Sequence, residues 1–162
     1  MSKGSLRPYR AEDKPAVVEI ADLAWRRINE SRRKFLGEEL FGVLFPNPDT
    51  RKGREMGGVC DSRPETILVY ELNGRVAGFI TYSLDTEKKI GTVGNNGVHP
   101  DCQGRGIAGE MYRALLERFR AAGMRFARVH TGLDEGHDPA RRAYEKAGFN
   151  IRWETVQYFM KL

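Results

Sequence analysis

A glycine-rich run in the middle of the chain has residue types and spacing that could bind a phosphate group. It extends from Val93 to Gly109 and changes from a strand-like to a helix-like pattern. The first turn of a helix leaves about four backbone N–H groups without partners, and the helix dipole favours an anion beside them. Gly104 and Gly106 keep side chains away from that backbone, and Arg105 adds a guanidinium group. The run therefore predicts a pyrophosphate-binding turn.

One phosphate motif in this run is the dinucleotide fingerprint, because Gly104 to Gly109 reads G-R-G-I-A-G. In that fingerprint the first glycine follows the strand almost directly, whereas residues 99–103 intervene here after Val98. The fingerprint also needs an acidic residue about 20 positions further on, and residues 129–131 read V-H-T in that region. The Gly-Lys-Ser/Thr ending of a nucleoside triphosphate loop is absent. These differences count against a dinucleotide oxidoreductase.

The same turn also reads Q-x-x-G-x-A, through Gln103, Gly106 and Ala108, and V-H-P-D precedes it at residues 98–101. This pattern resembles the acyl-CoA loop of the GNAT superfamily, the coenzyme-A-dependent N-acyltransferases. The first resemblance therefore lies on the predicted pyrophosphate turn itself.

A second resemblance to the same superfamily lies between residues 137 and 149. Similar acyltransferases carry Asn, then Ala, then Leu-Tyr and then Gly-Phe. This chain matches the pattern at four positions, which are Ala140, Tyr144, Gly148 and Phe149. It departs from the pattern at His137, where Asn is usual, and at Ala143, where a larger apolar residue is usual. Together the two resemblances extend from Ile90 to Phe149.

The resemblance implies an α/β fold whose mixed, mostly antiparallel sheet is flanked by helices and splayed between two central parallel strands. It implies acetyl-CoA as the cofactor, no metal, and direct acetyl transfer within a ternary complex to a small-molecule amine or a peptide N-terminus. The residues that it implies for cofactor binding are Val98, His99, Gln103, Gly104, Arg105, Gly106, Ile107, Ala108, Gly109, His137, Ala140 and Tyr144. The catalytic residues that we predict are Tyr144, Val98 and Asp134.

Acetyl transfer from a thioester to an amine makes three chemical demands. The amine must be neutral, the carbonyl oxygen needs hydrogen-bond donors, and the departing thiolate needs a proton. We assign Tyr144 as the proton donor, because its ordinary pKa near 10 lies only somewhat above the pKa of a thiol, about 8.5. The G-N-N-G sequence at residues 94–97 is poor for a regular strand and predicts a bulge that frees backbone groups. Val98 is expected to face the thioester.

The general base is left open among five side chains. They are Glu71, His99, Asp134, Glu135 and His137. Asp134 and Glu135 follow a predicted strand, so they are expected to line the amine side of the site, whereas histidine is the side chain best suited to neutral pH. A chain of water molecules without a dedicated base is the alternative, and Cys102 is interpreted as a bystander.

Composition favours an ordinary globular protein. The 162 residues, of which 40% are hydrophobic, predict one domain over 1–162, and the resemblance implies that it is an N-acetyltransferase domain. No apolar run approaches the roughly 20 residues of a membrane span, the N-terminus lacks a secretion signal, and two cysteines are too few for a disulfide framework. We therefore expect a cytoplasmic protein without a membrane partner. Whether two copies form a homodimer is left open.

The net charge of +5 suits the phosphates of coenzyme A and equally suits nucleic acid. One alternative function is accordingly a nucleic-acid-binding module that uses basic residues between positions 26 and 34. It lacks the interleaved aromatic residues of a single-strand binder, so nucleic acid is not an expected partner. Another alternative function is a non-catalytic acyl-CoA sensor, because the superfamily that the chain resembles includes non-catalytic members.

Local patterns predict the elements that must position these residues. The predicted strands are Leu6–Arg10, Thr66–Leu72, Arg75–Leu84, Ile90–Val98, Phe126–Thr131 and a strand-like Phe149–Leu162. The predicted helices are one that Asp13 caps, one over Phe35–Leu44, one over Gly104–Ala122 and one from Asp138 to Gly148, with a loop over residues 46–64. The strand, helix and strand between Ile90 and Thr131 form a crossover, so these two strands should be parallel neighbours.

Overall fold

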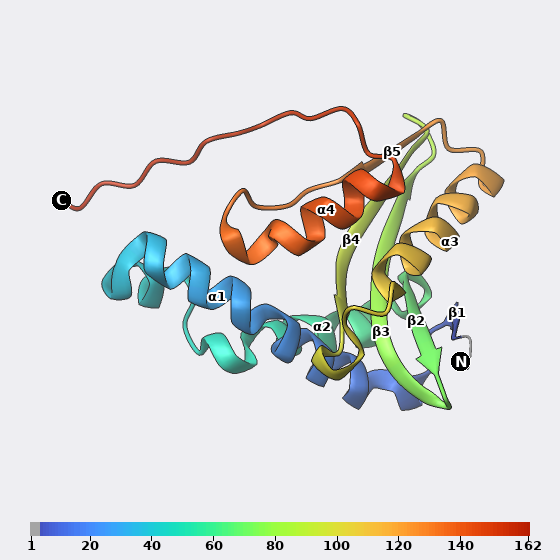
Figure 1. Cartoon of the computed structure of the whole chain (residues 1–162), viewed down its shortest axis with the longest axis horizontal. Coiled ribbons are helices and arrows are strands. Elements are labelled where there is room, and N and C mark those ends of the chain that lie inside the picture. The colour runs from blue at the N-terminus through green and yellow to red at the C-terminus, as the bar shows by residue number, and fades with distance from the viewer. Residues whose placement is uncertain (1–3) are drawn as a thin grey trace.

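Figure 1 shows a computed structural model of the chain, which describes residues 4–162. A five-stranded sheet runs in the order β1 (Ser5–Pro8), β2 (Ile67–Leu72), β3 (Arg75–Asp85), β4 (Ile90–Val98) and β5 (Phe126–Val129). The helices are α1 (Lys14–Leu44), α2 (Pro48–Ser62), α3 (Ile107–Ala121) and α4 (Asp138–Ala147). The first four strands pair antiparallel, and β5 pairs parallel to β4. This is the mixed, mostly antiparallel sheet that the sequence predicts.

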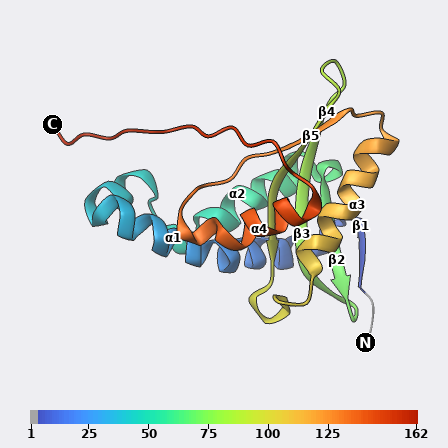
Figure 2. The same cartoon turned by 45° about the horizontal axis from the view of Figure 1, so that its top comes forward.

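Helices cover both faces of the sheet, as Figures 1 and 2 show. Alternate residues of β2 point to opposite faces, because side chains in a strand alternate. Ile67 and Val69 pack against α1 and α2, whereas Leu68 and Tyr70 belong to the cluster with α3 and α4. The strand is therefore apolar on both faces, and each helical pair has its own core.

The strand β4 carries a bulge and then leaves its parallel neighbour. Its register against β3 shifts by one residue, because Ile80 pairs with Asn96 but Tyr82 pairs with Val93. This confirms the predicted bulge in the G-N-N-G sequence. Pairing between β4 and β5 ends at Val93 and Val129, so residues 94–98 have no partner on the β5 side. The predicted splay between the two parallel strands therefore begins at the bulge.

The predicted loop over residues 46–64 is wrong, because most of it forms α2. Its glycines indicated a loop, but Gly53 and Gly57 lie where α2 packs closely on α1. The Gly53 N–H donates to the Asp22 carboxylate at 2.5 Å, and a Cβ on Gly53 would overlap that carboxylate. A Cβ on Gly57 would lie 3.6 Å from the Val18 side chain. Glycine here permits close helix packing instead of breaking the helix.

Other boundaries differ from prediction by smaller amounts. The two helices expected before residue 45 form one element, α1, with a kink at Gly37, where φ is 75°. The helix expected from Gly104 begins at Ile107, because Gly104 and Gly106 adopt positive φ angles. The first strand ends at Pro8 and the fifth at Val129.

The predicted strand over Phe149–Leu162 is not found. Residues 149–162 follow no hydrogen-bonded strand pattern. Phe149 packs against Tyr144, and the chain after it is extended and exposed as far as Lys161, which pairs with Glu39 of α1 (Figures 1 and 2). A strand needs a neighbouring strand, and no other segment within residues 4–162 pairs with this one. The apolar and aromatic composition that predicted a strand is therefore left exposed.

Buried Asp13 ties the start of α1 to β1 and generates a prediction about stability. Its carboxylate accepts two hydrogen bonds from Arg7, at 2.8 and 2.9 Å, and one from the Arg10 N–H at 2.7 Å. The Arg7 hydrogen bonds lower the pKa of Asp13, although burial opposes them. The folded protein therefore binds this proton less readily than the unfolded chain, so the stabilisation is present above pH 4 and is lost as pH falls.

We expect Asp13→Asn to lower the free energy of unfolding by about 1–3 kcal/mol at pH 7. The difference from the wild type should shrink below about pH 4, where the unfolded carboxyl also binds a proton. Urea denaturation at several pH values measures both effects. The control is Glu12→Gln, which removes the same charge from a side chain that is 74% exposed. Equal midpoints for Asp13→Asn and Glu12→Gln at pH 7 would contradict the prediction.

Candidate functional site

A cavity of about 1170 Å³ opens where β4 leaves β5. It is lined by the turn between β4 and α3, the bulged part of β4, the start of α4 and the middle of α1. Most of the residues predicted for the site line it, namely Val98, Gln103, Gly104, Gly106, Ile107, Ala108, Gly109, His137, Ala140 and Tyr144. The splay of the sheet thus brings the two motifs of the sequence into one cavity.

The glycine-rich turn presents backbone at the entrance to α3. Gly104 and Gly106 have φ angles of 74° and 79°, a left-handed conformation that favours glycine. Gly106 caps α3, so the N–H groups of residues 107–109 form the first helical turn and have no acceptor within the helix. Their positive ends and the helix dipole make this part of the cavity suitable for an anion.

Three polar residues of the turn have partners within the protein. The Gln103 amide donates to the Val98 carbonyl at 3.1 Å, and the Arg105 guanidinium donates to the Asp101 carbonyl at 3.2 Å. The His99 ring accepts from the Asp101 N–H. Gln103 lines the cavity, but His99 and Arg105 do not. Gln103 and Arg105 therefore stabilise the shape of the turn in this structure.

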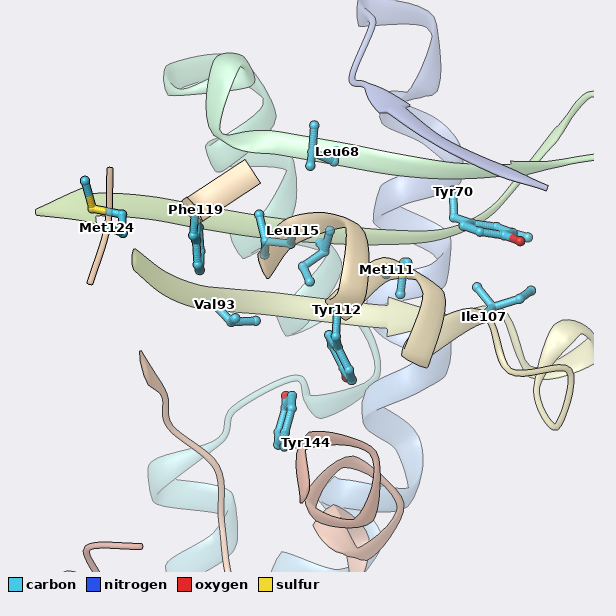
Figure 3. Packing of buried hydrophobic residues seen from close by; sticks show 12 residues of the cluster. Leu68, Tyr70, Val93, Ile107, Met111, Tyr112, Leu115, Phe119, Met124 and Tyr144 are labelled. Carbon is cyan, nitrogen blue, oxygen red and sulfur yellow. The ribbon is translucent and has the colours of Figure 1, made fainter. Parts of the chain in front are cut away.

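Tyr144 lies on the cavity wall within a chain of hydrogen bonds, and Figure 3 shows its ring directed toward Tyr112. The Tyr112 hydroxyl donates to the Asn96 carbonyl oxygen at 2.7 Å, and the Asn96 amide donates to the Tyr144 hydroxyl oxygen at 3.0 Å. Burial raises the pKa of Tyr112 and keeps it protonated as the first donor. Because the Tyr144 oxygen accepts from Asn96, its own proton remains available for another acceptor.

Sequence reasoning left the part played by Asn96 open. The bulge was the available signal, because it places Asn96 on the same face of the sheet as Val93, facing α3 and α4. The spacing between a strand residue and the two tyrosines could not be read from any local pattern. The structure joins these three residues through contacts distant in sequence.

His137 and Asp134 form a hydrogen-bonded pair beside the cavity. Their Nδ1 and Oδ2 atoms lie 2.6 Å apart, and the other carboxylate oxygen accepts from the Gly136 N–H at 2.9 Å. A Cβ on Gly136 would lie 2.7 Å from the Ile28 Cα, so glycine allows this turn to pack on α1. His137 lines the cavity, whereas Asp134 does not. With Nδ1 held by the carboxylate, Nε2 is the ring nitrogen available for chemistry.

Burial and charge set the protonation of this pair. Burial lowers the pKa of His137 below its ordinary value, although the Asp134 hydrogen bond opposes the shift. Burial acts to raise the pKa of Asp134, but hydrogen bonds from His137 and Gly136 outweigh it, so the net shift is downward. At neutral pH the arrangement therefore favours a neutral imidazole held by an ionised carboxylate.

The remaining candidates for a general base lie outside the cavity lining. Glu71 pairs with Arg7 on β1 at 2.8 Å, and Glu135 is exposed. The sequence considered His137 and Asp134 as separate candidates, whereas the structure joins them into one unit.

Basic side chains line the cavity on several walls, including Arg113 of α3 and Lys146 of α4. Arg26, Arg27, Arg63 and Arg128 line the cavity, and none of them forms an ion pair within residues 4–162. Glu30 is the one carboxylate among the described lining residues. The excess of positive charge in the cavity lining therefore favours a ligand with negative charge. No helix in the described part of the chain is long and apolar enough to cross a membrane.

Comparisons with known proteins agree with this geometry. The model of the acetyltransferase (GNAT) family matches residues 12–149. An acetyltransferase of Pectobacterium atrosepticum is 33% identical over 93 residues, which make up 57% of this chain and 60% of that protein. The chain therefore matches less than two thirds of the length of this relative.

Solved structures share the fold. Ard1 from Thermoplasma volcanium superposes with a TM-score of 0.65 at 23% identity, covering 93% of this chain and 84% of that one. A GNAT family acetyltransferase from Brucella melitensis, solved in complex with acetyl-CoA, superposes with a TM-score of 0.60 at 23% identity. That comparison covers 93% of this chain and 85% of the Brucella chain.

Proposed function

This chain belongs to the GNAT acetyltransferase family, and we propose that it transfers the acetyl group of acetyl-CoA to a primary amine by direct attack in a ternary complex. The acceptor is a small molecule or a peptide N-terminus. The observation that carries the proposal is the single cavity that joins an anion-binding helix start to a tyrosine with an available proton and to a histidine–aspartate pair. These three features would bind the cofactor, protonate the departing sulfur and accept the proton that the amine loses.

The turn between β4 and α3 would hold the pyrophosphate of acetyl-CoA. Its support is the left-handed backbone at Gly104 and Gly106 and the unpaired amides of the first turn of α3. The free edge of β4 over residues 94–98 would pair with the amides of the pantetheine arm, because β5 has left that edge. Acetyl-CoA supplies the activated thioester, and Val98 lies at the end of this edge, beside the turn.

Tyr144 would protonate the departing sulfur. As the amine nitrogen bonds to the carbonyl carbon and the C–S bond breaks, negative charge moves to the sulfur and must be neutralised. The Tyr144 hydroxyl is oriented by Asn96 and has its proton free, so it can donate that proton to the thiolate. Tyr112 supports the arrangement by fixing Asn96.

We expect Tyr144→Phe to lower kcat by about 10²-fold or more, because a positioned general acid contributes roughly 10²–10⁴-fold. Affinity for acetyl-CoA, measured by calorimetry, should change little. The control is Tyr70→Phe, which removes another buried hydroxyl, one that donates to Glu110 outside the cavity. Unchanged kcat in Tyr144→Phe would remove Tyr144 from the mechanism.

His137 would accept the proton that the amine loses on attack. Nε2 of a neutral imidazole is a suitable acceptor, and Asp134 holds the opposite nitrogen and so acts as a positioning residue. The catalytic role that the sequence predicts for Asp134 is therefore assigned to His137, its hydrogen-bond partner. His137 stands where the family pattern has Asn.

The protonation of His137 predicts the pH dependence of turnover. Because its pKa is lowered, kcat should fall on the acid side only below about pH 6.5, the ordinary pKa of histidine. His137→Gln should lower kcat and abolish this acid limb. Asp134→Asn removes a group that raises the pKa of His137, so the limb should move to lower pH. An unchanged acid limb in His137→Gln would contradict the assignment and favour the water-chain alternative.

The activity itself is tested by thiol release from acetyl-CoA against a panel of amines. We expect amine-dependent release, and the arginines on the cavity wall favour acceptors with a carboxylate. A free amino acid should therefore react faster than its amide and faster than a polyamine. Binding of acetyl-CoA without release across the panel would instead identify a non-catalytic acyl-CoA sensor.

A further inference from the structure

One face of the sheet changes from apolar to polar where it enters the cavity. Ile67, Val69 and Phe79 on this face belong to the buried cluster with α1 and α2. Thr81 and Ser83 follow Phe79 along β3 on the same face, because side chains in a strand alternate, and both line the cavity. This part of the cavity floor therefore offers hydroxyl groups, which can donate to a polar ligand and accept from it.

The neighbouring strands add a threonine and an arginine to the same face. Val93 of β4 and both Ala127 and Val129 of β5 pack in the cluster on the opposite face, with α3 and α4. The residues between them in the alternation, Thr92 and Arg128, therefore point to the α2 side, and both line the cavity. They are register partners in the parallel pair, and Nη2 of Arg128 donates to Oγ1 of Thr92 at 3.2 Å. This contact holds the guanidinium group over the cavity floor.

The charge of Arg128 is available to a ligand. The ion pairs of arginines within residues 4–162 involve other arginines. Arg63, directly after α2, also lines the cavity and also takes no part in those ion pairs. Thr92 accepts from one of the five N–H donors of Arg128, so the planar guanidinium retains donors that can bind a carboxylate through two parallel hydrogen bonds. This part of the cavity therefore suits an anionic group.

Strand geometry separates this guanidinium from the proposed reaction centre. Arg128 is held beside Thr92, whereas the Tyr144 hydroxyl lies at Asn96, four residues further along β4. At about 3.3 Å per residue, with one bulge between them, the separation is roughly 10–13 Å. A single amino acid spans only about 3.5 Å, whereas two or three extended residues span about 7–10 Å, to which a terminal hydrogen bond adds about 3 Å. A carboxylate bound at Arg128 therefore belongs to an acceptor longer than one amino acid.

We propose that the acceptor is a short peptide of two or three residues, whose free C-terminal carboxylate binds Arg128 while its N-terminal amine attacks the thioester. Thr92 holds the guanidinium in place, and Arg63 adds a second positive charge. The hydroxyl groups of Thr81 and Ser83 would bond the peptide groups between the two ends. This assignment rests on the acetyl transfer proposed above, because it places the amine at the thioester.

The first test measures thiol release from acetyl-CoA with glycine, diglycine and triglycine, each compared with its C-terminal amide. The three acids carry the same two end groups at different separations. Amounts are matched in neutral amine, because a nearby carboxylate changes the pKa of the amine. We expect the acid-to-amide ratio of kcat/KM to be about tenfold larger, or more, for diglycine or triglycine than for glycine, as for an added hydrogen bond to a charged group. A ratio that is equal at all three lengths, or largest for glycine, would overturn the proposal.

The linear acid 6-aminohexanoate distinguishes a peptide from another acceptor with a distant carboxylate. Its amine and carboxylate are separated about as far as those of diglycine, but it has no peptide group for Thr81 and Ser83 to bond. We expect its kcat/KM to be about threefold or more below that of diglycine at equal neutral amine, because those hydrogen bonds are lost. Equal or higher values for 6-aminohexanoate would show that the acceptor is not recognised as a peptide.

Substitutions test the residues assigned to the carboxylate. Arg128→Gln should lower the acid-to-amide ratio for triglycine by about fivefold or more, toward the value for glycine. Thr92→Val keeps the side-chain volume but removes the hydroxyl that holds the guanidinium, so it should lower the same ratio by a smaller factor. The matched control is Arg125→Gln, which removes the same charge from an exposed side chain outside the lining of this cavity, and thermal melting checks that each variant is folded. A triglycine ratio that Arg128→Gln leaves unchanged would contradict the assignment.

Failure of the acetyl transfer and failure of the peptide site give different results. If no amine releases thiol from acetyl-CoA, the acetyl transfer is wrong, and calorimetry of triglycine and its amide with the protein and coenzyme A tests the carboxylate site alone. Binding of triglycine about tenfold tighter than its amide, and lost in Arg128→Gln, would support the site, whereas equal affinities would overturn it. Thiol release with one common acid-to-amide ratio would leave the acetyl transfer standing and overturn only the peptide site.

Discussion

The separation of β4 from β5 after Val93 is the constraint on which the site depends. The two parallel strands pair over four residues, and the bulge at the G-N-N-G sequence then changes the register of β4 against β3. Without the separation there would be no cavity between the strands and no free edge at residues 94–98.

The same bulge connects the strand to the proposed chemistry. It directs Asn96 toward α3 and α4, where its amide lies between the hydroxyl groups of Tyr112 and Tyr144. It also leaves Asn95 on the other face, where its amide donates to Glu55 of α2 at 3.2 Å. The irregular backbone at residues 94–97 therefore contacts α2 through Asn95 on one face of the sheet and α4 through Asn96 on the other.

Much of the fold was predictable because its signals are local. Asn73-Gly74 fixes a hairpin turn, and the strand Ile90–Val98 and its bulge follow from β-branched residues interrupted by glycine and asparagine. The helix α2 was not predictable, because its glycines serve contacts with α1 and composition alone made them resemble a loop. The extended C-terminal segment has a strand composition, but no local pattern reveals that a strand lacks a neighbour.

The site was predictable in part for the same reason. The two motifs give the turn and Tyr144, because each motif is continuous in sequence. The pairing of His137 with Asp134 and the link from Tyr112 through Asn96 to Tyr144 depend on how distant elements pack. The charge of Arg105 predicts a contact with the cofactor, whereas the bond of its guanidinium to the Asp101 carbonyl depends on the shape of the turn and has no local sequence signal.

The most direct test of the central claim is a crystal structure of the protein with acetyl-CoA. We predict that the diphosphate lies within hydrogen-bond distance of the backbone N–H groups of residues 104–109, with the thioester between Val98 and Tyr144. A diphosphate bound anywhere else on the molecule would contradict the claim.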